Sequence, residues 1–183
     1  MKKLVLGLAT LSALAFGGSA GAQQAAGPRS AISINPIGLI FTVISAEFEH
    51  ALAPSYSVGV SASQWSFDEG DEFSSAEVSY FSTDAKLRYY PSATALRGFA
   101  LGGTAGFTRL GGSFENESGE ETGSANALSL GVLVDYNWLL GANNNFFVGT
   151  GIGAKRLFVT GIAEEEGLAL AYPTLRISVG YAF

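Results

Sequence analysis

Apolar residues alternate with polar or small residues along several stretches of this chain of 183 residues. Residues 175–183 show the pattern without a fault, because one parity is wholly apolar and the other carries Arg, Ser, Gly and Ala. A period of two residues predicts a β-strand with one apolar face. The repeat of this pattern limits the chain to a sheet in which a whole face is either buried or given to lipid.

The chain is apolar overall, with a mean hydropathy of +0.28 and only 14% charged residues. Nevertheless, residues 23–183 contain no run of about 20 apolar residues, the length that a membrane helix needs. Alternating strands reconcile the two observations, since each strand gives only a weak membrane signal.

Residues 1–22 have the pattern of a secretory signal peptide, with Lys2 and Lys3 before an apolar stretch and small residues at 19–22. Cleavage is expected before Gln23, and the apolar stretch is too short to serve comfortably as a membrane anchor. Residues 23–30 are predicted to be a flexible lead-in, and residues 31–183 the folded domain. The chain has no Cys, so disulfides cannot stabilise the exported protein.

Eight strands are predicted, and most approach or exceed the 9–11 residues that a tilted strand needs to cross a bilayer. They are residues 31–40, 43–52, 56–67, 76–90, 98–110, 126–140, 146–158 and 172–183. The first hairpin has no strong turn signal, and it is retained because closure with both ends on one side needs an even strand number. A change of parity at Trp65 and Phe67 predicts a bulge.

The connections alternate between short turns and long acidic loops. Short turns are predicted at 53–55, 91–97 and 141–145, and long loops at 68–75, 111–124 and 160–171. This pattern predicts an all-β fold, an eight-stranded antiparallel up-and-down transmembrane β-barrel, in the cell outer membrane with its long loops outside the cell.

The polar face decides whether the barrel is a membrane protein or a soluble one with an apolar lumen. It carries many Gly and Ser residues together with charges, which suits the narrow lumen of eight strands. Aromatic residues near the strand ends are predicted to form interfacial girdles facing lipid. These are Tyr89, Tyr90, Tyr136, Trp138, Phe146 and Phe147 beside the short turns, and Phe107 and Phe158 near the long loops.

Four acids and four bases fall on the polar face of the strands. They are Glu47, Glu49, Asp84, Lys86, Arg88, Asp135, Lys155 and Arg176. Buried charges are tolerated only when they are paired and hydrogen-bonded, so we expect a salt-bridged, plugged lumen. The alternative places some of these charges at the rims, in water.

No enzyme or cofactor site is expected. His50, the only histidine, is predicted on the lipid-facing side near a turn, and Ala51 and Leu52 follow it where lipid A deacylases carry a His-x-Ser motif. The glycines at 149–153 lie within a strand, so they fail the context of a nucleotide loop. The net charge of −6 gives no basic footprint for nucleic acid.

The three long loops hold eleven of the sixteen acids and no Lys or Arg. The acids are Asp68, Glu69, Asp71, Glu72, Glu115, Glu117, Glu120, Glu121, Glu164, Glu165 and Glu166. Carboxylates can hold divalent cations such as Ca²⁺, but the spacing at 68–72 is not that of a calcium hand. A solvated anionic surface is the alternative interpretation.

The signal peptide, the eight strands and the aromatic end of the last strand resemble the small outer-membrane β-barrels of the OmpA/OmpX type. That resemblance implies that Val179, Tyr181 and Phe183 form the recognition signal for the barrel assembly machinery. Residues 35–39 and 47–49 also resemble a family of uncharacterised bacterial barrels of the DUF3575 kind. No peptidoglycan-binding domain is expected after the barrel.

These observations together predict a monomeric protein in outer-membrane lipid, with a structural or surface-interaction role. The alternative function is a narrow porin-like passive channel for small solutes or ions.

Overall fold

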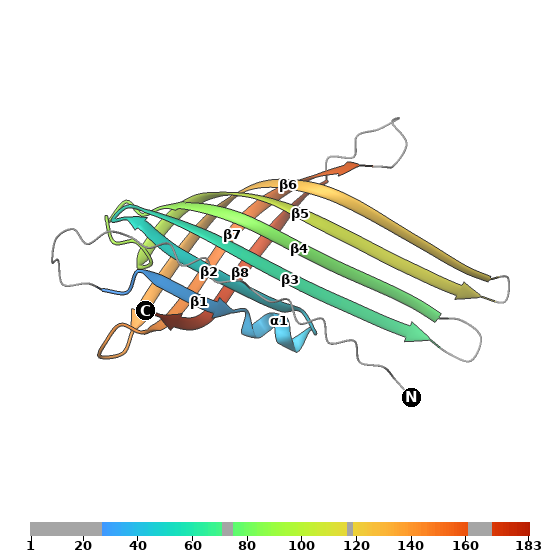
Figure 1. Cartoon of the computed structure of the whole chain (residues 1–183), viewed down its shortest axis with the longest axis horizontal. Coiled ribbons are helices and arrows are strands. Elements are labelled where there is room, and N and C mark those ends of the chain that lie inside the picture. The colour runs from blue at the N-terminus through green and yellow to red at the C-terminus, as the bar shows by residue number, and fades with distance from the viewer. Residues whose placement is uncertain (1–26, 71–74, 117–118, 161–169) are drawn as a thin grey trace.

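The computed structural model describes residues 27–70, 75–116, 119–160 and 170–183. In these residues eight strands form a closed barrel in chain order, each antiparallel to its neighbours, and β8 returns to pair with β1 (Figure 1). The predicted fold class is therefore confirmed. The predicted signal peptide, residues 1–22, lies outside the described residues.

The strands differ greatly in length. They are β1 (Ser30–Ile34), β2 (Ile44–Ala53), β3 (Tyr56–Gly70), β4 (Ser75–Tyr89), β5 (Gly98–Asn116), β6 (Gly119–Leu140), β7 (Phe146–Thr160) and β8 (Leu170–Ala182), with one helix, α1 (Pro36–Ile40). Among the described residues, no helix is both long and apolar enough to cross a membrane.

The barrel has two rims. The terminal rim is the end where Ser30 and Phe183 exchange two backbone hydrogen bonds, each of 2.8 Å, and it also carries the turns at 54–55, 90–97 and 141–145. The hairpin rim is the opposite end, where β3 joins β4, β5 joins β6 and β7 joins β8. Successive connections therefore alternate between the two rims, as predicted, but those at the hairpin rim are not uniformly longer than those at the terminal rim.

The first hairpin differs from the prediction, because residues 35–40 are not strand. β1 ends at Ile34, and Asn35 caps α1 by accepting hydrogen bonds from the backbone N–H of Ile37 at 3.0 Å and Gly38 at 3.1 Å. Pro36 fits the first helical position, where its missing N–H costs nothing. Asn35 and Pro36 are therefore a signal for the start of a helix, although the alternation of the flanking residues suggested a continuous strand.

The predicted long loop at 111–124 is also wrong, since most of it is strand. β5 pairs with β6 from Gly98 opposite Asn137 to Asn116 opposite Gly119, so these strands are 19 and 22 residues long. About half of each exceeds what a bilayer crossing needs. The two strands extend far from the terminal rim, together with β3 and β4 (Figure 1).

The bulge predicted at Trp65 and Phe67 is absent from the pairing of β3 with β4. That register runs without a shift from Tyr56 opposite Tyr89 to Gly70 opposite Ser75. An irregularity lies instead in the pairing of β2 with β3, between Ala51 and Ala53, close to the terminal rim.

The strand pairing around the barrel is shortest at the seam between β1 and β8. β1 pairs with β8 only through residues 31–34 opposite 179–182, whereas residues 170–178 of β8 have no β1 residue opposite them. At that height α1 lies near β8. The strand seam is therefore complete only near the terminal rim.

The outer face of the barrel is apolar and the inner face is polar. Val132, Ile152 and Leu175 are each about two-thirds exposed, whereas Arg88 and Asp135 are buried. A water-soluble barrel would have the opposite distribution, and apolar-out with polar-in is the arrangement of a transmembrane barrel. The membrane interpretation of the faces is therefore the one that the structure supports.

Most of the predicted girdle aromatics lie on the outer face. At the terminal rim, the rings of Tyr136 and Trp138 pack at 4.6 Å between centroids. Tyr90 and Phe147 do not belong to this girdle, because both are fully buried. Phe147 has the parity of the inward-facing Gly149 and Gly151, so the prediction for it was wrong by one position.

Candidate functional site: the charged lumen

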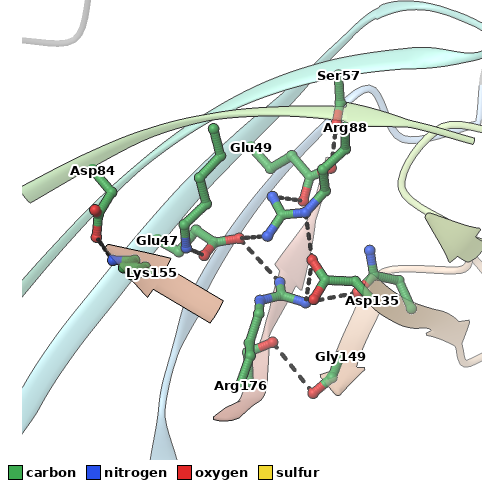
Figure 2. Close-up of polar contacts among 12 residues, drawn as sticks. Glu47, Glu49, Ser57, Asp84, Arg88, Asp135, Gly149, Lys155 and Arg176 are labelled. Atoms are coloured by element: carbon green, nitrogen blue, oxygen red, sulfur yellow. Dashed lines mark hydrogen bonds and ion pairs between the residues drawn. The ribbon is translucent and has the colours of Figure 1, made fainter. Parts of the chain in front are cut away.

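The eight predicted lumen charges all lie inside the barrel. β2 contributes Glu47 and Glu49, β4 contributes Asp84, Lys86 and Arg88, and β6, β7 and β8 contribute Asp135, Lys155 and Arg176. Charged residues on the same strand occupy alternate positions, so the eight side chains from five strands all point toward the barrel axis. Figure 2 shows seven of them labelled.

Arg88 is the centre of the network. Its side chain is completely buried, and it donates from Nε to Asp135 at 2.6 Å and from Nη1 to Glu49 at 3.0 Å. Its Nη2 lies 2.9 Å from a carboxylate oxygen of Glu47, an ion-pair distance whose geometry does not make a hydrogen bond. One guanidinium thus joins three carboxylates from two strands (Figure 2).

Glu47 is the second junction. It accepts from Nη2 of Arg176 at 3.0 Å and pairs with Lys86, in addition to its ion pair with Arg88. Arg176 also donates from Nη1 to Asn137 at 2.9 Å. The network therefore ties β2, β4, β6 and β8 together across the lumen.

A neutral layer of hydrogen-bonded side chains lies in the lumen on the terminal-rim side of Arg88. Glu49 accepts from the hydroxyls of Ser57 at 2.5 Å and Tyr90 at 2.6 Å, and Asn137 donates to the Tyr90 oxygen at 2.9 Å. The guanidinium carbon of Arg176 lies over the ring of Phe147, 5.6 Å from the ring centroid. Buried carboxylates require such partners, so this layer satisfies Glu49, whose one cation is Arg88.

These neutral partners were not among the predicted site residues. Ser57 and Asn137 have the inward parity of their strands, and Tyr90 continues the parity of Asp84, Lys86 and Arg88. Parity is therefore the sequence signal that places these three residues in the lumen, whereas charge does not mark them.

The outermost pair is Lys155 with Asp84. The lysine donates to the carboxylate at 2.6 Å, and both side chains retain about a tenth of their exposure. This pair lies on the hairpin side of Arg88, apart from the other ion pairs (Figure 2).

Strand glycines make room for the network. A Cβ added to Gly151 would collide with the carboxylate of Asp135, and one added to Gly106 would collide with that of Asp84. A Cβ on Gly103, which points away from the lumen, would meet nothing closer than 3.8 Å. Glycine inside these strands thus reflects close approach of a large neighbour.

A cavity of about 310 Å³ lies on the hairpin side of the network. Its wall includes the charged residues of the network other than Glu49, together with Tyr80, Thr104 and Tyr172. Two of the buried polar atoms on this wall, Oγ1 of Thr104 and Nε of Arg176, have no hydrogen-bond partner in the described part of the chain.

The remaining predicted residues are placed as follows. His50 is on the outward-facing parity of β2, with its Nδ1 2.8 Å from the hydroxyl of Ser30. Tyr181 and Phe183 are exposed on the outer face and stack at 6.3 Å, while Val179 is partly buried. The acidic side chains of the long loops lie outside the described residues, and no metal-binding group of three His, Asp or Glu occurs in the residues that are described.

No family model matches the chain, and no curated protein matches it. Among solved structures, Ail, the attachment invasion locus protein of Yersinia pestis, aligns with 86% of this chain and 100% of its own at 14% identity and a TM-score of 0.58. The N-terminal β-barrel domain of Pseudomonas aeruginosa OprF aligns with 86% of this chain and 98% of its own, at 14% identity and a TM-score of 0.46. Acinetobacter baumannii CarO2 aligns with 88% of this chain and 100% of its own, at 8% identity and a TM-score of 0.45.

The similarity to Ail is a similarity of fold. The chain shares with Ail the fold of a β-barrel, here closed by eight strands, and this is the fold that the resemblance seen in the sequence implied. The resemblance of residues 35–39 and 47–49 to the DUF3575 barrels stays a prediction.

Proposed function

We propose that the protein is an outer-membrane β-barrel whose lumen is closed and whose role is structural and surface-interactive. The observation that carries this proposal is the Arg88 network, because three carboxylates and a neutral layer of Ser57, Tyr90 and Asn137 fill the barrel beside it. An eight-stranded barrel leaves room for side chains and little else. The function is then carried by the outer surface and the rims.

The terminal rim faces the periplasm and the hairpin rim faces the outside of the cell in this proposal. The strands β3 to β6 are longer than a bilayer crossing needs and extend toward the hairpin rim, and this extension beyond the bilayer supports that orientation. The outer face meets outer-membrane lipid, and Val179, Tyr181 and Phe183 present the closing strand to the barrel assembly machinery.

The hairpin rim is the proposed interaction surface. β5 and β6 raise it well beyond the bilayer, and its segments at 68–75, 111–124 and 160–171 contain acids without a single base. The structure of Ail in complex with the heparin analogue sucrose octasulfate shows a related fold with a polyanion. An acidic rim would repel such a ligand, so we expect cationic partners or divalent cations here.

Single-channel recording in planar bilayers tests the closed lumen. We expect no stable conductance from the refolded protein, whereas an Arg88→Ser, Glu49→Ser variant should conduct, which shows that the preparation inserts. A stable conductance of porin size from the unchanged protein would contradict the closed lumen. It would favour the narrow passive channel, for which the cavity above the network is the supporting observation.

Binding to a cationic surface tests the acidic rim. A variant with Glu115, Glu117, Glu120 and Glu121 all changed to Gln keeps the hairpin length and removes four charges. We expect it to bind polylysine-coated beads and Ca²⁺ more weakly than the unchanged protein, with the difference vanishing in high salt. Equal binding by both proteins at low salt would contradict the proposal.

A further inference from the structure

We propose that the lumen cavity opens sideways at the seam between β1 and β8, and that it takes an anionic single-chain amphipath from the lipid. The headgroup, a carboxylate, lies in the cavity, and the hydrocarbon chain passes out between the strands. This inference requires the barrel to lie in a bilayer but does not depend on its surface role.

The first support is the incomplete seam. β1 ends at Ile34, so residues 170–178 of β8 face no strand on that side. The cavity is lined from both sides of this gap, by Ile34 and Asn35 on one side and by Leu175 and Ile177 on the other. The unpaired edge of β8 is therefore part of the cavity wall, with α1 beside it, and this edge is where the proposal places the opening.

Pro173 marks the same edge. Phe183 turns its N–H and C=O toward β1 and Ala182 turns its N–H away, so odd-numbered residues of β8 face the seam. Pro173 is odd and has no N–H, which removes one donor from the open edge. Proline within a sheet is confined to such edges.

The second support is the charge of the cavity wall. Lys86, Arg88, Lys155 and Arg176 contribute four positive charges to it, whereas Glu47, Asp84 and Asp135 contribute three negative ones. The eighth charge, Glu49, does not line the cavity. Among the groups that line the cavity, cations therefore outnumber anions by one, and Glu49 pairs with Arg88 behind the wall.

Two buried groups on this wall can donate to an anion. Nε of Arg176 and Oγ1 of Thr104 have no partner among the described residues, and Thr104 is 7% exposed. A carboxylate bonded to either would satisfy a donor that now has no partner, which favours an anionic occupant over an apolar one.

Size and surroundings select a single chain. A cavity of about 310 Å³ is at the lower end of small-molecule sites, too small for two acyl chains but sufficient for a headgroup and the first carbons of one. Around the seam, four apolar side chains are exposed, namely Ile34, Leu175, Ile37 and Leu39. A hydrocarbon chain leaving the seam would therefore stay against an apolar surface.

Fluorescence quenching in lipid nanodiscs tests the proposal. In a background without the native tryptophans (Trp65→Phe, Trp138→Phe), Leu175→Trp reports on the seam and Leu128→Trp reports on the lipid face of β6. The probe is 11-bromoundecanoate. We expect saturable quenching of the Leu175→Trp reporter, and only the linear quenching of partitioned probe for the Leu128→Trp reporter. Parallel curves for the two reporters would overturn the proposal.

The two halves of the ligand are tested separately. The matching bromo-alcohol has the chain without the anion, and it should quench both reporters linearly. Acetate has the anion without the chain, and at millimolar concentration it should not compete with the probe. Competition by acetate would mean a free-anion site without use of the seam, and saturable quenching by the alcohol would mean an apolar site. Either result refutes the amphipath.

Two variants test the structural basis. Thr104→Val keeps the shape of the wall, removes a donor and should weaken saturable binding about threefold to tenfold. Asn35→Cys with Ile177→Cys allows a flexible bis-maleimide to close the seam, since the chain has no other Cys. Crosslinking should abolish saturable quenching, while the same double variant without crosslinker retains it. Full binding after complete crosslinking would contradict entry through the seam.

Discussion

Replacing Arg88 by Met should destabilise the barrel more than any other single change in the lumen. The side chain is fully buried and lies within 3.0 Å of three carboxylates. After the change, Glu47 keeps Lys86 and Arg176, and Asp135 keeps Arg176 at 3.8 Å, but Glu49 has no cation left. Removing one partner of a buried pair typically costs about 3–5 kcal/mol.

We therefore expect a loss of about 3–5 kcal/mol in the free energy of unfolding, measured by urea titration in lipid vesicles with tryptophan fluorescence. The matched control is Lys155→Met, which removes one ion pair at the more exposed end of the network. Its cost should be less than half that of Arg88→Met, because the lysine has a single carboxylate partner and retains some solvent.

A second substitution isolates the cause. Glu49→Gln in the Arg88→Met background should recover about 1–2 kcal/mol, since it removes the one acid left without a cation. A cost below about 1 kcal/mol for Arg88→Met, or no recovery from the double change, would refute the reasoning that a single guanidinium holds these carboxylates.

Three further changes are informative. Gly106→Ala should sharply reduce the yield of folded, heat-modifiable barrel on gels because its Cβ would meet Asp84, whereas Gly103→Ala should fold normally; equal yields would contradict the close approach. Val132→Arg, on the lipid face, should cost about 2–4 kcal/mol in vesicle unfolding, whereas Ser124→Arg, beyond the bilayer, should stay within about 0.5 kcal/mol. Deleting Phe183 should lower the amount of folded barrel in the outer membrane of cells, and unchanged assembly would remove it from the assembly signal.

Parity predicted most of the barrel because it depends only on which face a side chain occupies. The charges from Glu47 to Arg176 meet in the lumen because every one of them has the parity opposite to the apolar residues of its strand. The pairing partners could not be read from the sequence, since they depend on strand stagger, which parity leaves open.

Local chemistry explains what the sequence did not reveal. Asn35 and Pro36 start a helix inside an apparently continuous strand, and that helix ends the pairing of β1 after Ile34. Apart from Phe114, residues 111–116 are polar or glycine, a composition that suggests a loop, yet they pair with β6 because their neighbours already hold the register. The intrinsic strand propensity of a residue matters less than its pairing with a neighbouring strand that is already in register.

The unequal strand lengths also imply an order of folding. β5 and β6 are joined by the two residues 117–118, so their long ladder can form as a local hairpin at little entropic cost. The β1–β8 ladder instead joins Ala31 to Ala182, almost the ends of the folded chain, and is the shortest of the eight. Such a non-local contact forms late and slowly. We therefore expect the pairing of residues 179–182 with β1 to be the slowest step, which an assembly catalyst would accelerate most.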